Sequence, residues 1–129
     1  MYIKSSHYLV TLLYNSRDFE ASKSLILKIF ELINSDLLEG PISLKLNSLL
    51  SSCHLVLGET EQAYKIALKG LEMTREENGE RSLETASAFY KLGYICSKQQ
   101  KNDECLIYLS NCINIAQGIN SADIDKKLD

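Results

Sequence analysis

The sequence lacks the features that point to a metal site, a membrane span or a nucleic-acid surface. Only two histidines occur, His7 and His54, and no His-x-x-x-His or Cys-x-x-Cys spacing gathers ligands for zinc. No apolar run approaches the ~20 residues of a membrane-spanning helix. The formal net charge of −3 gives no electrostatic reason to expect nucleic acid or an anionic membrane. We therefore expect no metal, no membrane and no nucleic-acid partner.

A secretion signal is also missing from the N-terminal stretch MYIKSSHYLV, which has one lysine and no long apolar core. A cytoplasmic location is therefore expected. In that compartment cysteines rarely form disulfides, and all four lie within apolar helical patterns. We expect small buried thiols at these positions: Cys53, Cys96, Cys105 and Cys112.

Catalytic groupings are equally scarce. Cys53 and His54 are adjacent, so on a helix their side chains diverge by about 100° instead of pairing as nucleophile and base. His54 lies on an apolar face and is expected to be a packed, hydrogen-bonded histidine. No glycine-rich phosphate loop occurs. The sequence thus predicts a protein that is not an enzyme and that carries no cofactor.

What the sequence does contain is helix signal along its whole length. Hydrophobic residues make up 45% and charged residues 24%, which is typical of a globular domain, and 129 residues fit a single domain spanning 1–129. The only proline, Pro41, follows Gly40 and suits the first turn of a helix. Ser82 follows an Asn-Gly stop and suits a helix N-cap. Apolar spacings of three and four predict six helices, at residues 3–15, 19–34, 42–57, 61–77, 83–99 and 103–118.

These helices repeat when the chain is shifted by 42 residues. The shift superposes Asp18, Thr60 and Asn102, each of which suits a helix N-cap at the start of a second helix. Three helix pairs therefore fill the chain. The predicted repeats cover approximately residues 1–42, 43–84 and 85–120, and 121–129 remain as a stub or cap.

Small residues recur where the two helices of a pair would cross. The same shift superposes Ala21, Ala63 and Cys105. Helix axes approach to the short end of the ~8–10 Å range only where side chains are small. We expect Ala63 to meet Ser51 of its own pair, and Cys105 to meet Gly93 in the same way.

Residues 49–72 (LLSSCHLVLGETEQAYKIALKGLE) and 91–116 (KLGYICSKQQKNDECLIYLSNCINIA) resemble the tetratricopeptide repeat. Gly58 and Ala63 stand where that family shows its turn glycine and its packing alanine. In the first pair Leu9 replaces the small residue, which is a departure from the family pattern. A period of 42 is similar to the long repeats of kinesin light chains and of the peptide-sensing domains of Rap-type and PlcR-type regulators.

The resemblance implies an all-α fold of three antiparallel helix pairs stacked as a right-handed superhelix. It also implies a non-enzymatic module, regulatory or scaffolding, that binds a peptide or protein segment in its concave groove. Tyr90 and Tyr94 lie one turn apart beside the apolar stripe of their helix, although such tyrosines can also pack on a neighbouring repeat. The predicted groove residues are Tyr14, Lys45, Ser48, Ser52, Ser87, Tyr90, Tyr94, Ser97 and Lys98.

The last predicted helix is apolar almost all round, which predicts burial on more than one side. Three explanations stay open: residues 121–129 fold back as an incomplete cap, another chain covers the helix, or the chain belongs to a longer array. The alternative function is therefore an assembly module, such as a homodimer, with an interface at Leu106, Leu109 and Ile113. The mixed-charge run at residues 72–81 is expected to be a solvated surface.

Overall fold

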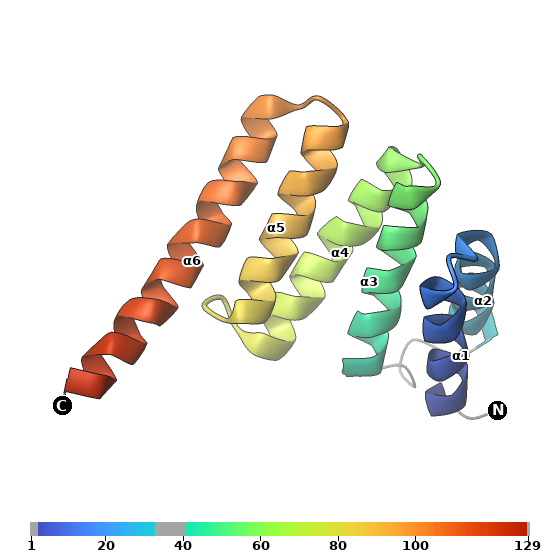
Figure 1. Cartoon of the computed structure of the whole chain (residues 1–129), viewed down its shortest axis with the longest axis horizontal. Coiled ribbons are helices and arrows are strands. Elements are labelled where there is room, and N and C mark those ends of the chain that lie inside the picture. Colours follow the sequence, from blue (N-terminus) through green and yellow to red (C-terminus); the bar gives the residue numbers. More distant parts are fainter. Residues whose placement is uncertain (1–2, 33–40, 129) are drawn as a thin grey trace. The chain divides into compact units, whose positions relative to one another are not determined.

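The chain forms six α-helices in the part that its structure, a computed structural model, describes: residues 3–32 and 41–128, with side chains for 8–32 and 42–120 (Figure 1). No strand occurs in these residues, so the predicted all-α class is confirmed. The helices are α1 (Ile3–Asn15), α2 (Phe19–Leu32), α3 (Pro41–Val56), α4 (Thr60–Asn78), α5 (Leu83–Lys98) and α6 (Asn102–Leu128). Two compact units divide the chain, Met1–Ile66 and Ala67–Asp129, and the boundary lies within α4.

The predicted helix boundaries agree with the structure to within two residues except at the last helix. Residues 33 and 34 of the second predicted helix lie outside the described residues. The predicted end at residue 118 is wrong, because α6 is 27 residues long and continues through Leu128. A lone glycine such as Gly118 costs a helix about 1 kcal/mol relative to alanine but does not end it. Residues 121–128 therefore extend α6 and do not fold back as a separate cap.

The three turns that join paired helices share one hydrogen-bond pattern. Arg17, Gly58 and Gln100 have positive φ angles of 64°, 82° and 61°. The N–H group of each donates to the carbonyl oxygen three residues earlier, at 3.0, 3.1 and 3.1 Å. The following N–H group donates to the carbonyl oxygen five residues before it, at 3.0, 2.8 and 2.9 Å. This is the Schellman motif, which satisfies carbonyl groups at the end of a helix.

These turns correct the repeat register. Arg17 and Gly58 are 41 residues apart, whereas Gly58 and Gln100 are 42 apart. The uniform shift of 42 is therefore wrong by one residue in the first pair. Ser22, not Ala21, is the counterpart of Ala63.

The facing position on α1 moves by one residue as well. In the corrected register it is Val10 and not Leu9. Val10 and Ser22 are fully buried, while the Leu9 side chain is exposed. The first pair therefore also has a small residue where its helices cross, and this residue is the serine on α2.

The first two hairpins close at the same place with a side-chain hydrogen bond. In the first pair the Ser22 hydroxyl donates to the Val10 carbonyl oxygen at 3.3 Å. In the second pair the Ser51 hydroxyl donates to the Ala63 carbonyl oxygen at 3.0 Å. The predicted contact of Ala63 with Ser51 is thus confirmed. A buried hydroxyl without such a partner would cost about 1–3 kcal/mol, so these bonds fix the register of each hairpin.

The third hairpin closes at this place without a hydroxyl. A Cβ atom built on Gly93 would lie 3.5 Å from the Cys105 carbonyl oxygen, 3.0 Å from Leu109 Cγ and 2.9 Å from Leu109 Cδ2. Real Cβ atoms hardly ever approach another heavy atom that closely, so α5 and α6 use the missing side chain to approach each other. The predicted contact of Cys105 with Gly93 is confirmed.

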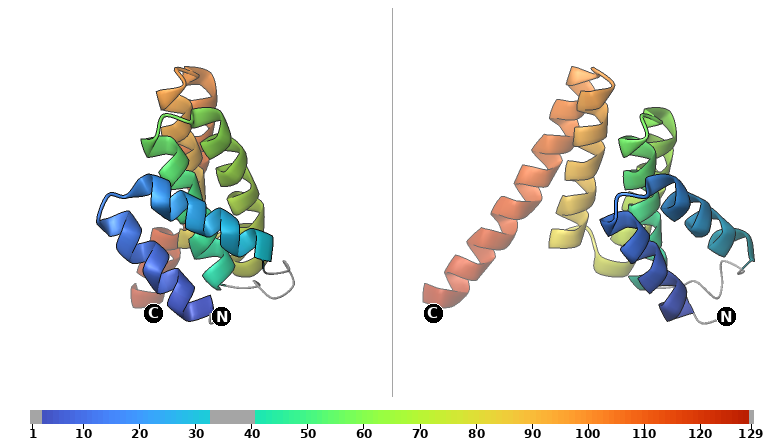
Figure 2. Two further views of the ribbon diagram at one scale, coloured as in Figure 1. Left: turned by 90° about the vertical axis from the view of Figure 1, so that its right-hand side faces the viewer. Right: turned by 45° about the vertical axis from the view of Figure 1, so that its right-hand side comes forward.

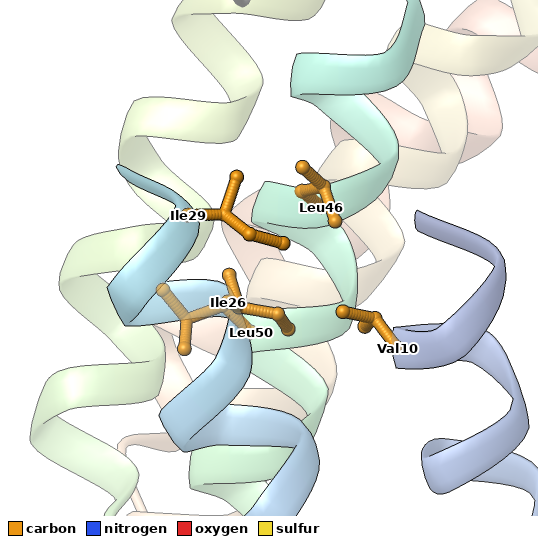
Figure 3. Close-up of a cluster of buried hydrophobic side chains, with 5 residues drawn as sticks. All are labelled: Val10, Ile26, Ile29, Leu46 and Leu50. Carbon is orange, nitrogen blue, oxygen red and sulfur yellow. The ribbon is translucent and has the colours of Figure 1, made fainter. Parts of the chain in front are cut away.

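The core of the first unit ties α3 to both helices of the first hairpin. Figure 3 shows its five buried side chains, which converge from α1, α2 and α3: Val10, Ile26, Ile29, Leu46 and Leu50. Burying an aliphatic side chain stabilises the fold by about 1.5–3 kcal/mol relative to leaving it exposed. Because the five residues come from three helices, the first hairpin and α3 stabilise one another.

In the second unit, α5 begins at the N-cap that the sequence predicted, Ser82. The Ser82 hydroxyl accepts a hydrogen bond from the Thr85 backbone N–H at 3.1 Å, and Gly79 supplies the left-handed turn before it with φ 86°. From their connecting turn α5 and α6 run side by side, and α6 then extends away from α5 (Figures 1 and 2). None of the described helices is at once long enough and apolar enough to span a bilayer.

The crossing at Ala63 predicts a steric test. Ala63 is fully buried while Gln62 beside it is exposed. We expect Ala63→Leu to lower the free energy of unfolding by about 1–3 kcal/mol, because the extra carbons force α3 and α4 apart. Gln62→Leu adds a leucine one residue away and should change it by no more than about 0.5 kcal/mol. Urea unfolding followed by circular dichroism measures both. Equal values for the two variants would contradict the close crossing.

Candidate functional site

One face of α5 carries exposed side chains at helical spacing. Leu83, Ser87, Tyr90, Tyr94 and Lys98 follow one another at intervals of four, three, four and four residues, and all five are exposed. Tyr90 and Tyr94 are 57% and 44% exposed. The Lys98 ammonium lies 5.3 Å from the centre of the Tyr94 ring, a cation–π contact. We call these five residues the tyrosine stripe.

The opposite face of α5 explains why the stripe stays free. Phe89, Leu92, Gly93 and Cys96 are buried, and they follow the second set of three- and four-residue spacings along the helix. Since a helix presents these two sets on different faces, packing of the buried set leaves the tyrosine stripe in solvent. The sequence prediction included every member of the stripe except Leu83. The helical spacing could have identified Leu83, because it precedes Ser87 by one turn.

The other predicted groove residues belong to the first unit. Lys45 and Ser48 are exposed on α3, and Ser52, one turn further along, is half-buried. Tyr14 of α1 is half-buried and packs edge-on against Phe19, with ring centres 5.3 Å apart and planes at 79°. Ser97 is exposed beside the tyrosine stripe. Tyr14 thus packs within its own helix pair and not on a neighbouring repeat, and it is less exposed than Tyr90 and Tyr94.

The three predicted interface residues of α6 differ in exposure. Leu106 and Ile113 are 64% and 54% exposed, and their spacing of seven places them on one face of α6. Leu109 shares this face by its spacing, but it lies at the edge towards α5, where it is half-buried against Gly93. An exposed isoleucine that the prediction omitted, Ile107, lies on the adjoining face.

A three-residue polar cluster joins α2 to the end of the second hairpin. The buried His54 has its Nδ1 atom 3.1 Å from Glu59 Oε1, so the predicted packed and hydrogen-bonded histidine is confirmed. The Lys23 ammonium donates to the same oxygen at 3.0 Å. This hydrogen bond, with help from His54, holds the pKa of the Glu59 carboxyl below its ordinary value, and it raises the pKa of Lys23.

The cysteines are free thiols, of which Cys53 and Cys96 are buried and the other two half-buried. Burial, with the nearby Glu104 carboxylate, raises the pKa of the Cys96 thiol. A raised pKa removes the thiolate that a nucleophile or a metal ligand requires. In the described part of the chain, no three histidine, cysteine or acidic side chains gather where they could hold a metal ion.

No protein-family model matches the chain, and no curated protein matches it.

The polar cluster predicts how stability depends on pH. Glu59 titrates at 4.5 in its ordinary state and lower in the folded protein. Its contribution is therefore present above about pH 4.5 and is lost as the pH falls through the lower folded-state pKa. We expect Glu59→Gln to be less stable than the wild type at pH 5, and the difference to shrink as the pH falls below about 4.5. Thermal unfolding at half-unit pH steps measures this. Glu76→Gln, at an exposed carboxylate, is the control, and a Glu59→Gln deficit that persists unchanged at low pH would contradict the cause.

Proposed function

We propose that the protein is a non-enzymatic peptide- or protein-binding module of the tetratricopeptide type, acting as a cytoplasmic regulator or scaffold. The observation that carries the proposal is the tyrosine stripe of α5, which presents Leu83, Tyr90 and Tyr94 to solvent on a rigid helix. The three identical hairpin turns and the small-residue crossings support a repeat architecture. In this proposal the pairs stack as a right-handed superhelix with the stripe on its concave surface.

The chemistry of the stripe suits a polypeptide partner. Tyrosine is enriched among the residues that dominate binding energy, because it buries a large rigid ring and keeps a hydroxyl for hydrogen bonding. Leu83 adds apolar area at one end, and Lys98 adds a cation at the other. Ser87 between them supplies a small hydroxyl. A helical or extended segment with apolar side chains and a carboxylate would match this order of groups.

Removal of the two rings tests the proposal. We expect Tyr90→Ala/Tyr94→Ala to weaken binding of the partner at least about tenfold, since interface tyrosines commonly contribute more than 1 kcal/mol each. The partner is captured from native lysate with the wild type, identified by mass spectrometry, and its binding segment is titrated by calorimetry.

Tyr8→Ala is the matched control, because Tyr8 is an exposed tyrosine outside the stripe. All variants must show the helical content of the wild type. Unchanged affinity in the folded double variant would exclude the tyrosine stripe as the binding surface.

A second candidate function is assembly through α6. The exposed pair Leu106 and Ile113 supports it, because two large aliphatic side chains on one helix face bury well against a second copy of the chain. In this proposal the protein is a homodimer or larger assembly, and Leu109 contributes only by packing within its own hairpin.

Sedimentation velocity over a concentration series tests the assembly. We expect the wild type to associate and Leu106→Lys/Ile113→Lys to remain monomeric, since two charges desolvated in an apolar interface oppose association. Leu27→Lys, at a partly exposed leucine of α2, should associate as the wild type does. A wild type that stays monomeric at the highest concentration would contradict the assembly function.

A further inference from the structure

A pocket of about 370 Å³ lies in the second unit, away from the tyrosine stripe. It is formed by the end of α4, the turn before α5, the first half of α5 and the middle of α6. Its polar side chains come from three of these four segments. The lining residues are Arg75, Glu80, Arg81, Phe89, Asn111, Asn114 and Ile115.

An apolar wall and a stacked guanidinium give the pocket a defined shape. Phe89 is buried, Ile115 is half-buried, and both line the pocket. The Arg75 guanidinium carbon lies 5.1 Å from the centre of the Phe89 ring, so the cation covers the ring face. The pocket therefore combines an aromatic surface with polar groups, as small-ligand sites usually do.

The two arginines of the pocket differ in their partners. Arg75 pairs with two carboxylates, Glu72 at 3.2 Å and Glu80 at 3.3 Å. The Nε atom of Arg75 forms the pair with Glu80 as a charge contact without hydrogen-bond geometry. Arg81 pairs with no carboxylate among the side chains that the structure describes. The two guanidinium groups and the two carboxylates thus sum to zero charge, but both carboxylates are held by Arg75, so the Arg81 guanidinium keeps its N–H donors available at the pocket.

The position of Arg81 depends on a glycine of α6. A Cβ atom built on Gly118 would lie 3.3 Å from Arg81 Nη1, which is tighter than most real Cβ contacts. The glycine therefore gives the guanidinium room to reach α6. On that helix Asn111 and Asn114 are three residues apart, so both amides reach the pocket from one face.

We infer that this pocket binds a carboxylate carried by a polypeptide. The Arg81 guanidinium keeps its donors available, and its planar fork matches the two oxygens of a carboxylate. A phosphate group carries nearly two negative charges, which one unpaired guanidinium does not balance. The asparagine amides are suited to the peptide groups beside the carboxylate, and Phe89 and Ile115 to an adjoining apolar side chain. The carboxylate is either a chain terminus or an acidic side chain.

The pocket is a second site and does not rest on the proposed function. Phe89 lines the pocket and Tyr90 belongs to the tyrosine stripe, and consecutive residues of a helix point about 100° apart. The double tyrosine variant should therefore keep the pocket intact. A variant that loses binding at one site and keeps it at the other therefore distinguishes the two sites.

Three synthetic peptides test the inference against the full chain. The first is an acetylated tetrapeptide that ends in leucine with a free carboxylate, the second is its C-terminal amide, and the third is that amide with an internal glutamate. Each is titrated into isotopically labelled protein, and the Asn111 and Asn114 side-chain amides and the Arg81 Nε–H are followed by NMR.

We expect saturable shifts of these groups with the first or the third peptide, which identifies a terminal or a side-chain carboxylate as the ligand. Arg81→Gln should weaken that binding about tenfold or more, Arg81→Lys less, and Arg17→Gln, an exposed arginine in another turn, not at all. Equal shifts with the neutral amide, no shifts with either acid, or unchanged binding by the folded Arg81→Gln variant would each overturn the inference.

Discussion

The close approach of two helices a few residues from their turn is the constraint on which each hairpin depends. Once the Schellman turn sets where the second helix begins, the fourth residue of that helix must lie against the first helix. At that point the three pairs place a serine, an alanine and a cysteine, opposite a valine, a serine and a glycine. Larger side chains there would separate the axes, and the helices would then lose the apolar contacts further along. The exposed face of α5 has the same origin, because the packing of Gly93 towards α6 determines which side chains remain outside.

Much of the fold could be predicted, because helical periodicity and small residues are local signals. The crossings at Ala63 and Gly93 followed from size alone, and both agree with the structure. The register of the first pair could not be predicted in this way. Its turn has Arg17 in the left-handed conformation, where glycine is the usual sign, and the third turn likewise uses Gln100. A non-glycine residue in the left-handed conformation costs about 1–2 kcal/mol, and the two capping hydrogen bonds of the turn offset this cost. The local sequence contains no residue that predicts such a turn.

The two candidate sites differ in how far apart their residues lie in the sequence, and this distance decides how well each could be predicted. The tyrosine stripe lies on one helix, so spacing predicted all of it but Leu83. The pocket combines residues of α4, α5 and α6, and its arginines stand in a run of alternating charges that looks like an ordinary solvated surface. Only the folded arrangement shows that Arg75 holds both Glu72 and Glu80, while Arg81 pairs with none of the carboxylates that the structure describes. Leu109 could not be assigned from the sequence either. The last helix is apolar on all sides, so its pattern does not show which of its leucines packs against α5.

The serine at the hairpin crossing changes sides between pairs. In the first pair the hydroxyl comes from the second helix, and in the second pair it comes from the first helix, yet each donates to the carbonyl facing it. The requirement thus falls on the combined volume of two facing positions and not on either one. In the first pair the first helix carries a valine at this position, and the residue facing it is a small serine. Across related chains such a rule would surface as compensating exchanges between two alignment columns, each of which looks variable by itself.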